Sequence, residues 1–353
     1  MMHPALTRAS DFAQELGISC PILLAPMAGA CPVSLSAAVA AGGGMGACGA
    51  LLMTPEQING WARDMRETSN GSFQMNIWIP DPTPRRDAQH EAHLRDHLAK
   101  WGPAVPEDAA ETPLLDFDEQ CRAMLAASPS AMSSIMGLYP PDIVAEMKAR
   151  GIKWFATVTT VAEARAAAEA GADVIVAQGM EAGGHRGAFD ADQAASALVG
   201  LFALLPAVAD AVDVPVVATG GIADARGIAA ALVLGASAVQ IGTGFLRAPE
   251  AQTNPTWAAA LARTAPEDTI ATTAFSGRLG RSVRNAYATS DGPAPAPYPI
   301  QRSLTGPMRS KAAKDGNIDA MQAWAGQSAA RASDEPAERI ITRLWDETLS
   351  QFG

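Results

Sequence analysis

Two ten-residue stretches of this chain share one design. Residues 170–179 (AGADVIVAQG) and 234–243 (LGASAVQIGT) each place a glycine just before a short apolar run and another just after it. A glycine at a helix end accepts the left-handed backbone that closes many helices. An apolar run of about four or five residues between such glycines is typical of a buried strand. The two stretches therefore predict helix–strand units of the kind that build helix-covered parallel sheets.

Similar apolar runs recur through the first 248 residues and predict eight strands. We expect these strands at residues 21–25, 45–50, 73–79, 131–137, 153–158, 174–178, 215–218 and 238–241. Helices are predicted between them, at residues 34–41, from Thr54 onward, and at 142–150, 161–170, 191–212 and 223–234. Eight strands that alternate with helices predict an α/β fold, the (β/α)8 TIM barrel, over residues 1–248.

Two segments interrupt this alternation. Residues 81–127 are charged and dotted with proline, and we expect an insertion after the third strand that lies over the barrel mouth. Residues 249–353 predict a C-terminal helical cap packed on the barrel, with helices at 249–265, 319–325 and 336–352.

The insertion contains three histidines, His90, His93 and His97. On a helix, His93 and His97 would share one face and could bind a metal ion. A metal site needs further ligands of a suitable type, and none is evident nearby in the sequence. A solvated helical face is the favoured interpretation, and we expect no metal.

Composition excludes some classes of partner. The formal net charge is −11, which repels the phosphates of nucleic acids and of anionic membranes. The four cysteines are scattered, which fits a reducing compartment. The first 15 residues lack the pattern of a secretory signal, so we expect no leader, and no run of 18 apolar residues occurs in this sequence. We therefore expect a cytoplasmic protein whose partners are small molecules, with a homo-oligomer as an open alternative to a monomer.

The loop after the sixth strand is the richest in reactive groups. Residues 178–187 (QGMEAGGHRG) combine Gln178, Glu181, His185 and Arg186 with four glycines. Active sites of TIM barrels lie at the carboxyl ends of the strands, which is where this loop belongs. His185 is thus the candidate catalytic residue. The alternative is a glycine-rich turn whose histidine only binds a backbone carbonyl.

Two further glycine turns follow the last two strands. Residues 219–222 (TGGI) come after the seventh strand and residues 242–245 (GTGF) after the eighth. TIM barrels often bind phosphate with these two loops, and we expect a phosphate-bearing ligand here, although both could be ordinary turns. The spacing of a dinucleotide or P-loop fingerprint is missing.

With these loops placed, the chain resembles the nitronate monooxygenases, formerly called 2-nitropropane dioxygenases. The resemblance is carried by residues 25–29 (APMAG), 75–78 (MNIW), 178–187, 218–222 (ATGGI), 240–243 (QIGT), 275–278 (FSGR), 298–299 (YP) and 324–327 (WAGQ). It implies an FMN enzyme that oxidises alkyl nitronates with O₂ to a carbonyl compound and nitrite.

The same resemblance implies the roles of individual residues. His185 is implied as the catalytic residue. Apart from the resemblance, Ser276 and Tyr298 are candidates for the substrate pocket, with simple packing as the alternative for a tyrosine in a proline-rich loop. The residues implied to bind the cofactor are Met27, Asn76, Gln178, Gly183, Gly220, Gly221, Gln240, Ile241, Gly242 and Thr243.

Other flavin barrels remain alternatives. The loop Glu-Ala-Gly-Gly-His is shared with FMN-dependent enoyl-acyl-carrier-protein reductases and with some NADH:quinone reductases. The enoyl reductases tend to carry an acidic residue where this chain has Gln178, which favours the monooxygenase. An NAD(P)H-dependent reductase is therefore the second hypothesis, and a non-enzymatic flavin-binding barrel would leave His185 and Arg186 without a function.

Overall fold

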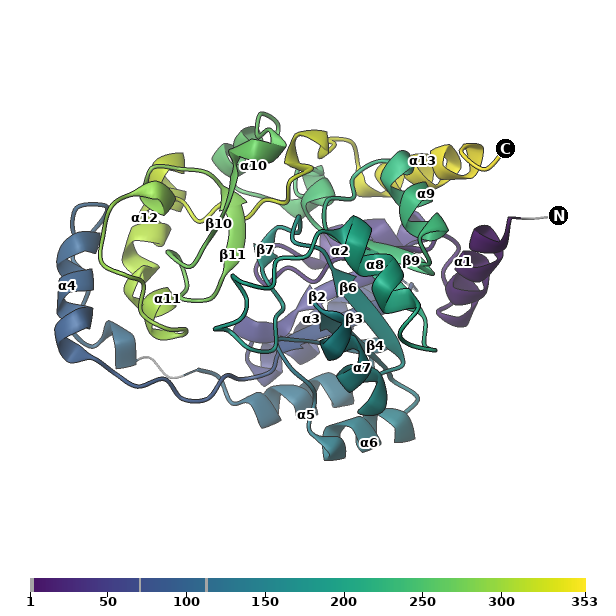
Figure 1. Cartoon of the computed structure of the whole chain (residues 1–353), viewed down its shortest axis with the longest axis horizontal. Coiled ribbons are helices and arrows are strands. Elements are labelled where there is room, and N and C mark those ends of the chain that lie inside the picture. The colour runs from purple at the N-terminus through teal and green to yellow at the C-terminus, as the bar shows by residue number, and fades with distance from the viewer. Residues whose placement is uncertain (1–2, 70, 112–113) are drawn as a thin grey trace.

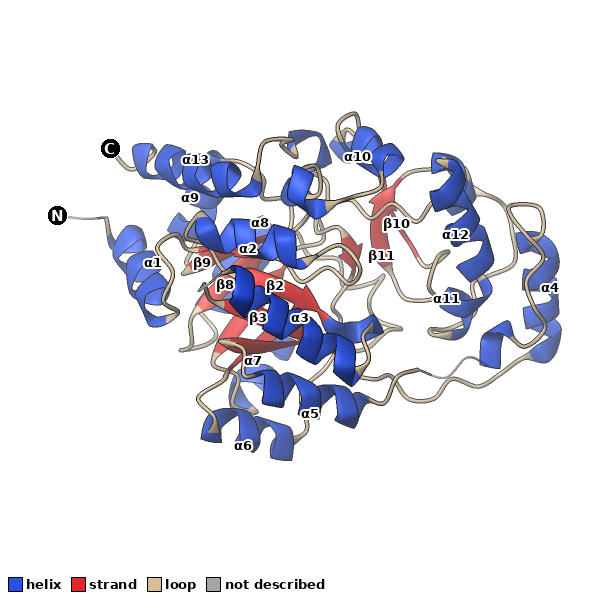
Figure 2. Cartoon of the chain, turned by 180° about the vertical axis from the view of Figure 1, so that it is seen from behind, coloured by secondary structure: helices blue, strands red, loops and turns tan. Residues whose placement is uncertain are grey.

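Eight parallel strands form the centre of the molecule in the computed structural model, which describes residues 3–69, 71–111 and 114–353. The strands are β1 (Ile22–Leu24), β2 (Gly46–Gly49), β3 (Phe73–Trp78), β4 (Ala131–Ile135), β5 (Lys153–Val158), β6 (Val174–Gln178), β8 (Val216–Thr219) and β9 (Ala238–Ile241). They pair in the order β1-β9-β8-β6-β5-β4-β3-β2, and a bridge from Leu23 to Met45 closes the sheet. The predicted TIM barrel is confirmed (Figure 2).

Eight helices surround the strands, and the last of them comes from the end of the chain. The ring consists of α2 (Val33–Ala41), α3 (Pro55–Thr68), α5 (Phe117–Ala127), α6 (Pro141–Ala149), α7 (Val161–Glu169), α8 (Leu201–Ala209), α9 (Ala225–Val233) and α13 (Ala337–Ser350). Helix α13 contacts α2 and α9, so it fills the position after β9. Its side chains Ile340, Ile341 and Leu344 are buried in the barrel's main core.

Local sequence sets the starts of several of these helices. Thr54 and Gln57 form the capping box expected at α3, in which each side chain receives a backbone N–H of the other's residue. Thr160 and Glu163 do the same at α7. Such caps satisfy N–H groups that lack partners in the first helical turn.

A short N-terminal helix closes the amino-terminal end of the barrel. Helix α1 (Pro4–Glu15) contributes Phe12 to a buried cluster that also contains Phe155 and Val217 from the barrel strands. The loops at the carboxyl ends of the strands are thereby left as the barrel's open face. None of the described helices combines the length and hydropathy needed to cross a membrane.

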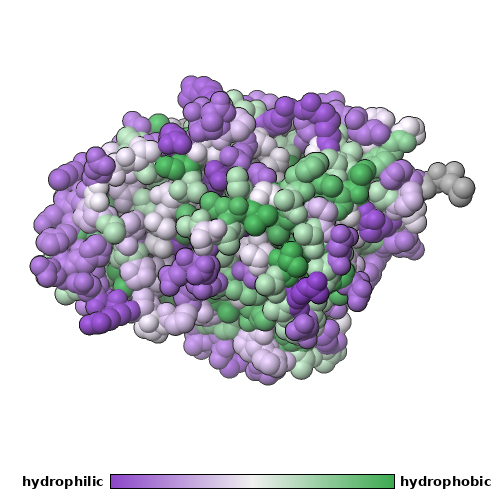
Figure 3. All heavy atoms as spheres, in the orientation of Figure 1, coloured by the Kyte–Doolittle hydropathy of each residue, from purple (hydrophilic) through white to green (hydrophobic). Residues whose placement is uncertain are grey.

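A cap covers that open face and draws on two distant parts of the chain. It contains α4 (Ala88–Leu98), α10 (Pro255–Leu261), α11 (Ile300–Leu304), α12 (Gly306–Asp315), β10 (Thr269–Thr272) and β11 (Gly280–Val283). Leu94 and Leu98 of α4 share a buried cluster with Leu304 and Met308. In Figure 1, α4, α11 and α12 lie at the end of the molecule away from both termini. In Figure 3, hydrophilic side chains dominate that end.

The cap and the barrel are joined by a small antiparallel sheet. Its third strand is β7 (Gly184–His185), which pairs with Gly280 and Arg281 of β11. The loop that carries His185 is therefore held as an edge strand of the cap sheet. Its glycine-rich sequence gives no indication of a strand.

The segment 81–127 divides between the two parts of the fold. Helix α4 belongs to the cap, but α5 packs against α3 and α6 on the outside of the barrel. The cap insertion after β3 therefore ends before Phe117, and the segment 249–353 likewise returns to the barrel at α13. Amphipathic sequence alone does not say which core a helix face will meet.

One predicted helix is wrong, and another begins later than predicted. Residues 319–325 hold only the end of a 3-10 turn, after which Ala323 and Ala325 form backbone hydrogen bonds with Val283 and Arg281 of β11. Residues 191–200 are irregular before α8 begins at Leu201. In the first case pairing with a neighbouring strand overrides the helical preference of the local sequence.

Candidate functional site

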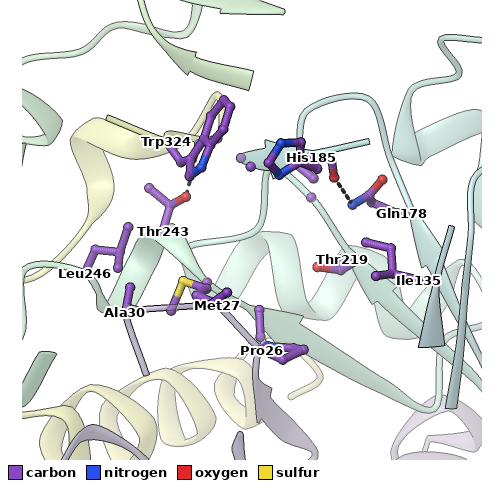
Figure 4. Close-up of a pocket in the computed structure, with 18 of the residues that line it drawn as sticks. Pro26, Met27, Ala30, Ile135, Gln178, His185, Thr219, Thr243, Leu246 and Trp324 are labelled. Atoms are coloured by element: carbon purple, nitrogen blue, oxygen red, sulfur yellow. Dashed lines mark hydrogen bonds between the residues drawn. The ribbon is translucent and has the colours of Figure 1, made fainter. Parts of the chain in front are cut away.

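A cavity of about 350 Å³ lies where the open end of the barrel meets the cap. Its walls come from the turns that follow β1, β6, β8 and β9, and from cap residues such as Trp324 and Arg302. Figure 4 shows Pro26 and Met27 on one side of it, across from His185 and Trp324. This volume falls within the range of small-molecule and cofactor sites.

One part of the cavity is built to receive an anion. The backbone N–H groups of Gly220, Gly221, Gly242 and Thr243 donate no hydrogen bond to any described residue. Gly220 and Gly221 have φ angles of +113° and +71°, which exposes the turn's backbone in a conformation that favours glycine. Clustered free N–H groups of this kind form the concave sites that bind phosphate.

Gly183 allows three loops to meet beside these turns. A Cβ atom at this position would lie 2.4 Å from the backbone nitrogen of Gly326 and 2.9 Å from the hydroxyl of Thr243. The Gly326 N–H donates to that hydroxyl at 3.0 Å. The His185 loop, the turn after β9 and the cap are therefore in contact only because residue 183 has no side chain.

Two amides present complementary groups to the cavity. Nδ2 of Asn76 donates to the carbonyl and hydroxyl of Ser133, which leaves its Oδ1 as an acceptor. Nε2 of Gln74 donates to Leu24 and to Oε1 of Gln240, so Gln240 is left with its NH₂ group. One acceptor and one donor suit a ring whose edge carries both an N–H and carbonyl oxygens.

Gln178 organises the His185 loop with its own hydrogen bonds. Its Nε2 donates to the carbonyl of His185 at 3.0 Å (Figure 4), and its Oε1 accepts the N–H of Gly187 at 2.8 Å. Arg186 is buried and donates to the carbonyls of Gln178, Thr159 and Ala197. The loop around His185 is thus fixed on both sides of the histidine.

Ser276 determines which nitrogen of the His185 ring carries the proton. Nε2 of His185 lies 2.8 Å from the Ser276 hydroxyl, which also lies 3.1 Å from the carbonyl of Arg278 and 3.3 Å from its N–H. All three contacts are satisfied when the hydroxyl donates to that carbonyl and accepts the other two. His185 then carries its proton on Nε2, and Nδ1 has its lone pair free.

The surroundings of His185 keep its ring neutral. Burial lowers the pKa of His185 from 6.5 to about 3, and the positive charges of Arg278, Arg302 and Arg309 add to this effect. A neutral imidazole at ordinary pH is a weak base and carries no charge with which to attract an anion. The positive potential of the site must come from other groups.

Every predicted cofactor residue lies on the cavity wall, together with His185. These residues are Met27, Asn76, Gln178, Gly183, Gly220, Gly221, Gln240, Ile241, Gly242 and Thr243. The two substrate-pocket candidates lie behind the wall: Ser276 is fully buried under His185, and Tyr298 packs against Trp78 at a centroid distance of 5.1 Å.

Sequence reasoning missed several residues on the cap side of the wall. Trp78 and Trp324 both contact the His185 ring edge to face, at 4.6 and 4.7 Å. Arg302 and Arg309 also line the cavity. Trp78 and Trp324 both lie in segments that carried the family resemblance (75–78 and 324–327), but neither position alone indicates a site.

Comparisons with known proteins show the family to which the chain belongs. The family described as "Nitronate monooxygenase" matches residues 10–347. A nitronate monooxygenase of Paraburkholderia phytofirmans is 38% identical over 93% of this chain and 92% of its own length. A probable nitronate monooxygenase of Bacillus subtilis is 34% identical over 96% of this chain and 99% of its own.

Two solved structures are similar along the whole chain. A nitroalkane oxidase from Streptomyces ansochromogenes aligns with a TM-score of 0.88 at 34% identity, covering 98% of this chain and 100% of that one. FabK from Thermotoga maritima aligns with a TM-score of 0.74 at 27% identity, covering 98% and 96%. The chain therefore belongs to the nitronate monooxygenase family and is an oxidoreductase.

Proposed function

We propose that the protein binds FMN in this cavity and oxidises alkyl nitronates with O₂ to a carbonyl compound and nitrite. The observation that carries the proposal is one cavity that joins free backbone N–H groups at the turns after β8 and β9 to the loop of His185. Family membership points to the same substrate class.

The residues present fit FMN. Its phosphate would lie on the N–H groups of Gly221 and Thr243, in the arrangement that phosphate-binding barrels use. The polar edge of its ring would meet Asn76 and Gln240, and its flat face would lie on Met27. When bound, the flavin accepts electrons from the nitronate and passes them to O₂.

The chain's own contribution is to position the nitronate and to exclude water. His185 and Trp324 lie across from Met27 (Figure 4), and together with Trp78, which contacts the His185 ring, they form an aromatic wall. A nitronate between this wall and the flavin would have little water around it, which strengthens its interactions with charged groups nearby. The substrate is already deprotonated, so the reaction needs no strong base, in keeping with the low pKa of His185.

The test is aerobic turnover of the purified protein. We expect about one FMN per chain, rapid nitrite release from preformed ethyl nitronate, and slow NADH oxidation. Rapid flavin reduction by NADH together with no nitrite release would favour the NAD(P)H-dependent reductase. A colourless protein that binds no added FMN in a titration would contradict both hypotheses.

A matched pair of glycine variants locates the phosphate. Gly221→Asp places a negative charge where the phosphate would approach the backbone and should weaken FMN binding at least tenfold. Gly151→Asp is the control, because Gly151 has a similar φ (+69° against +71°) but lies exposed and away from the cavity. Equal FMN affinities in the two variants would place the phosphate elsewhere.

A further inference from the structure

One cation on the cavity wall is not used by the fold. Arg302, on α11, lines the cavity and is only partly buried. Its guanidinium forms no hydrogen bond or ion pair with any of the described residues. Most partly buried arginines in this chain do have such partners, for example Arg247 with Asp334.

A second arginine beside it has a hydrogen-bond acceptor for each of its three guanidinium nitrogens. The guanidinium of Arg309 donates to the Thr305 hydroxyl at 3.0 Å, to Oε1 of Gln322 at 2.8 Å and to the backbone carbonyl of Arg302 at 2.8 Å. All three acceptors are neutral. Burial lowers the pKa of Arg309 to about 10, and the charge of Arg302 adds to that effect.

The two charges therefore lie close together, and neither has a carboxylate partner in the part of the chain that the structure describes. Asp81 and Arg302 both act electrostatically on Tyr298, so Asp81 is a carboxylate in the same region. It is already paired with Arg278 through two hydrogen bonds. Two neighbouring cations repel each other, and partial burial makes that repulsion costly. In a protein with a net charge of −11, such a pair marks a place where an anion binds.

Arg302 also lies on the His185 side of the cavity. The charges of Arg302 and Arg309 both act on the His185 ring, whereas the free N–H groups belong to the turns after β8 and β9. The cavity thus has two separate positive regions. One suits a cofactor phosphate, and the other faces the space beside His185 where a substrate would react.

We propose that Arg302 binds the negatively charged oxygens of the substrate and so selects the nitronate anion over the neutral nitroalkane. This inference rests on the proposed function. His185 is neutral and cannot make this selection by charge. The planar guanidinium, with several N–H donors in a fork, matches the two oxygens of a nitronate as it matches a carboxylate.

The experiment compares Arg302→Gln and Arg302→Lys in the FMN-loaded protein. Loss of a charge-assisted hydrogen bond should raise KM for ethyl nitronate about 10- to 100-fold in Arg302→Gln, with a much smaller change in kcat. Arg302→Lys keeps the charge but loses the fork, so its KM should lie between those of Arg302→Gln and the wild type. An unchanged KM in Arg302→Gln overturns the inference.

A binding measurement tests Arg302 without turnover. Nitrate is a flat anion with the charge of a nitronate, and its binding beside the flavin can be followed by the flavin absorbance. We expect Arg302→Gln to weaken nitrate binding at least tenfold. If wild-type protein releases no nitrite from nitronates, the proposed function fails, but the nitrate titration still decides whether Arg302 holds an anion.

Two controls separate substrate binding from effects of overall charge and of cofactor loss. Arg165→Gln removes the same charge from an exposed position on α7, far from the cavity lining. An equal loss of nitrate affinity in Arg165→Gln would overturn the inference, because the charge of the whole protein would then account for the loss. A fall in the FMN content of Arg302→Gln would also overturn it, since Arg302 would then hold the cofactor.

Discussion

At the scale of single residues, Ser276 determines how His185 is presented. Among the described residues, its hydroxyl is the one group within hydrogen-bond distance of Nε2 of the ring, at 2.8 Å. Ser276→Ala removes that acceptor and leaves the His185 N–H unpaired, at a cost of about 1–3 kcal/mol. We expect kcat/KM for ethyl nitronate to fall about 10- to 100-fold, with FMN content unchanged.

Steady-state kinetics with a rescue variant checks this prediction. Ser276→Thr keeps the hydroxyl and should retain more activity than Ser276→Ala. Ser310→Ala, at an exposed position of α12, serves as the control. Equal kinetic constants for Ser276→Ala and the wild type would mean that the Ser276 hydroxyl does not position the ring.

The residues of the site differ in how far their sequence context could predict them. The glycine turns and the His185 loop follow strands of a recognisable barrel, and the geometry of that fold brings them together. Arg302 and Trp324 come from the cap, whose packing has no repeating pattern. Their positions at the cavity depend on contacts between segments that are distant in sequence, such as the contact of Gly183 with Gly326.

At the scale of elements, Arg278 fastens the cap to the barrel. Its guanidinium pairs with Asp81 after β3 and donates to the Ala188 carbonyl after β7 at 2.9 Å, while its side chain is 1% exposed. Breaking a buried ion pair typically costs about 3–5 kcal/mol. Because Asp81 is 23% exposed, we expect Arg278→Gln to lower the free energy of unfolding by about 3 kcal/mol.

Denaturant unfolding with hydrogen exchange measures this effect. Exchange should quicken first in β11, which lies beside β7, and later in the barrel strands. Lys311→Gln breaks an exposed pair with Asp315 on α12 and should cost less than about 0.5 kcal/mol. If both variants lower the free energy of unfolding by the same amount, the contacts of Arg278 do not stabilise the packing of the cap on the barrel.

The elements also show where sequence patterns are insufficient. Residues 336–352 follow the cap in sequence, which predicts a cap helix, yet α13 completes the barrel between α2 and α9. Helix α5 lies within the predicted insertion for the same reason and also packs on the barrel. An apolar helix face predicts that the helix is buried on that side. Which surface it packs against depends on where the closed barrel leaves a position between two neighbouring helices.

At the scale of the whole molecule, the enclosed His185 ring couples folding to pH. The pKa of His185 is about 3 in the folded protein, against 6.5 for an exposed histidine. Between these values the unfolded chain binds a proton that the folded chain does not, so stability falls as the pH is lowered. The free energy of unfolding contains the full contribution of His185 above pH 6.5. As the pH falls this contribution is lost, and the loss reaches about 2 kcal/mol at pH 5.

His185→Asn should therefore lose less stability between pH 7 and pH 5 than the wild type does. Urea unfolding at the two pH values measures the difference, which should be about 2 kcal/mol smaller in the variant. His93→Asn is the matched control, because His93 lies exposed on α4 and outside the cavity lining. Other groups also titrate in this range, and their effect cancels when the two variants are compared. Identical pH slopes for His185→Asn and His93→Asn would mean that folding leaves the pKa of His185 near 6.5, and below that pH the charged ring would then be a second cationic partner of the nitronate beside Arg302.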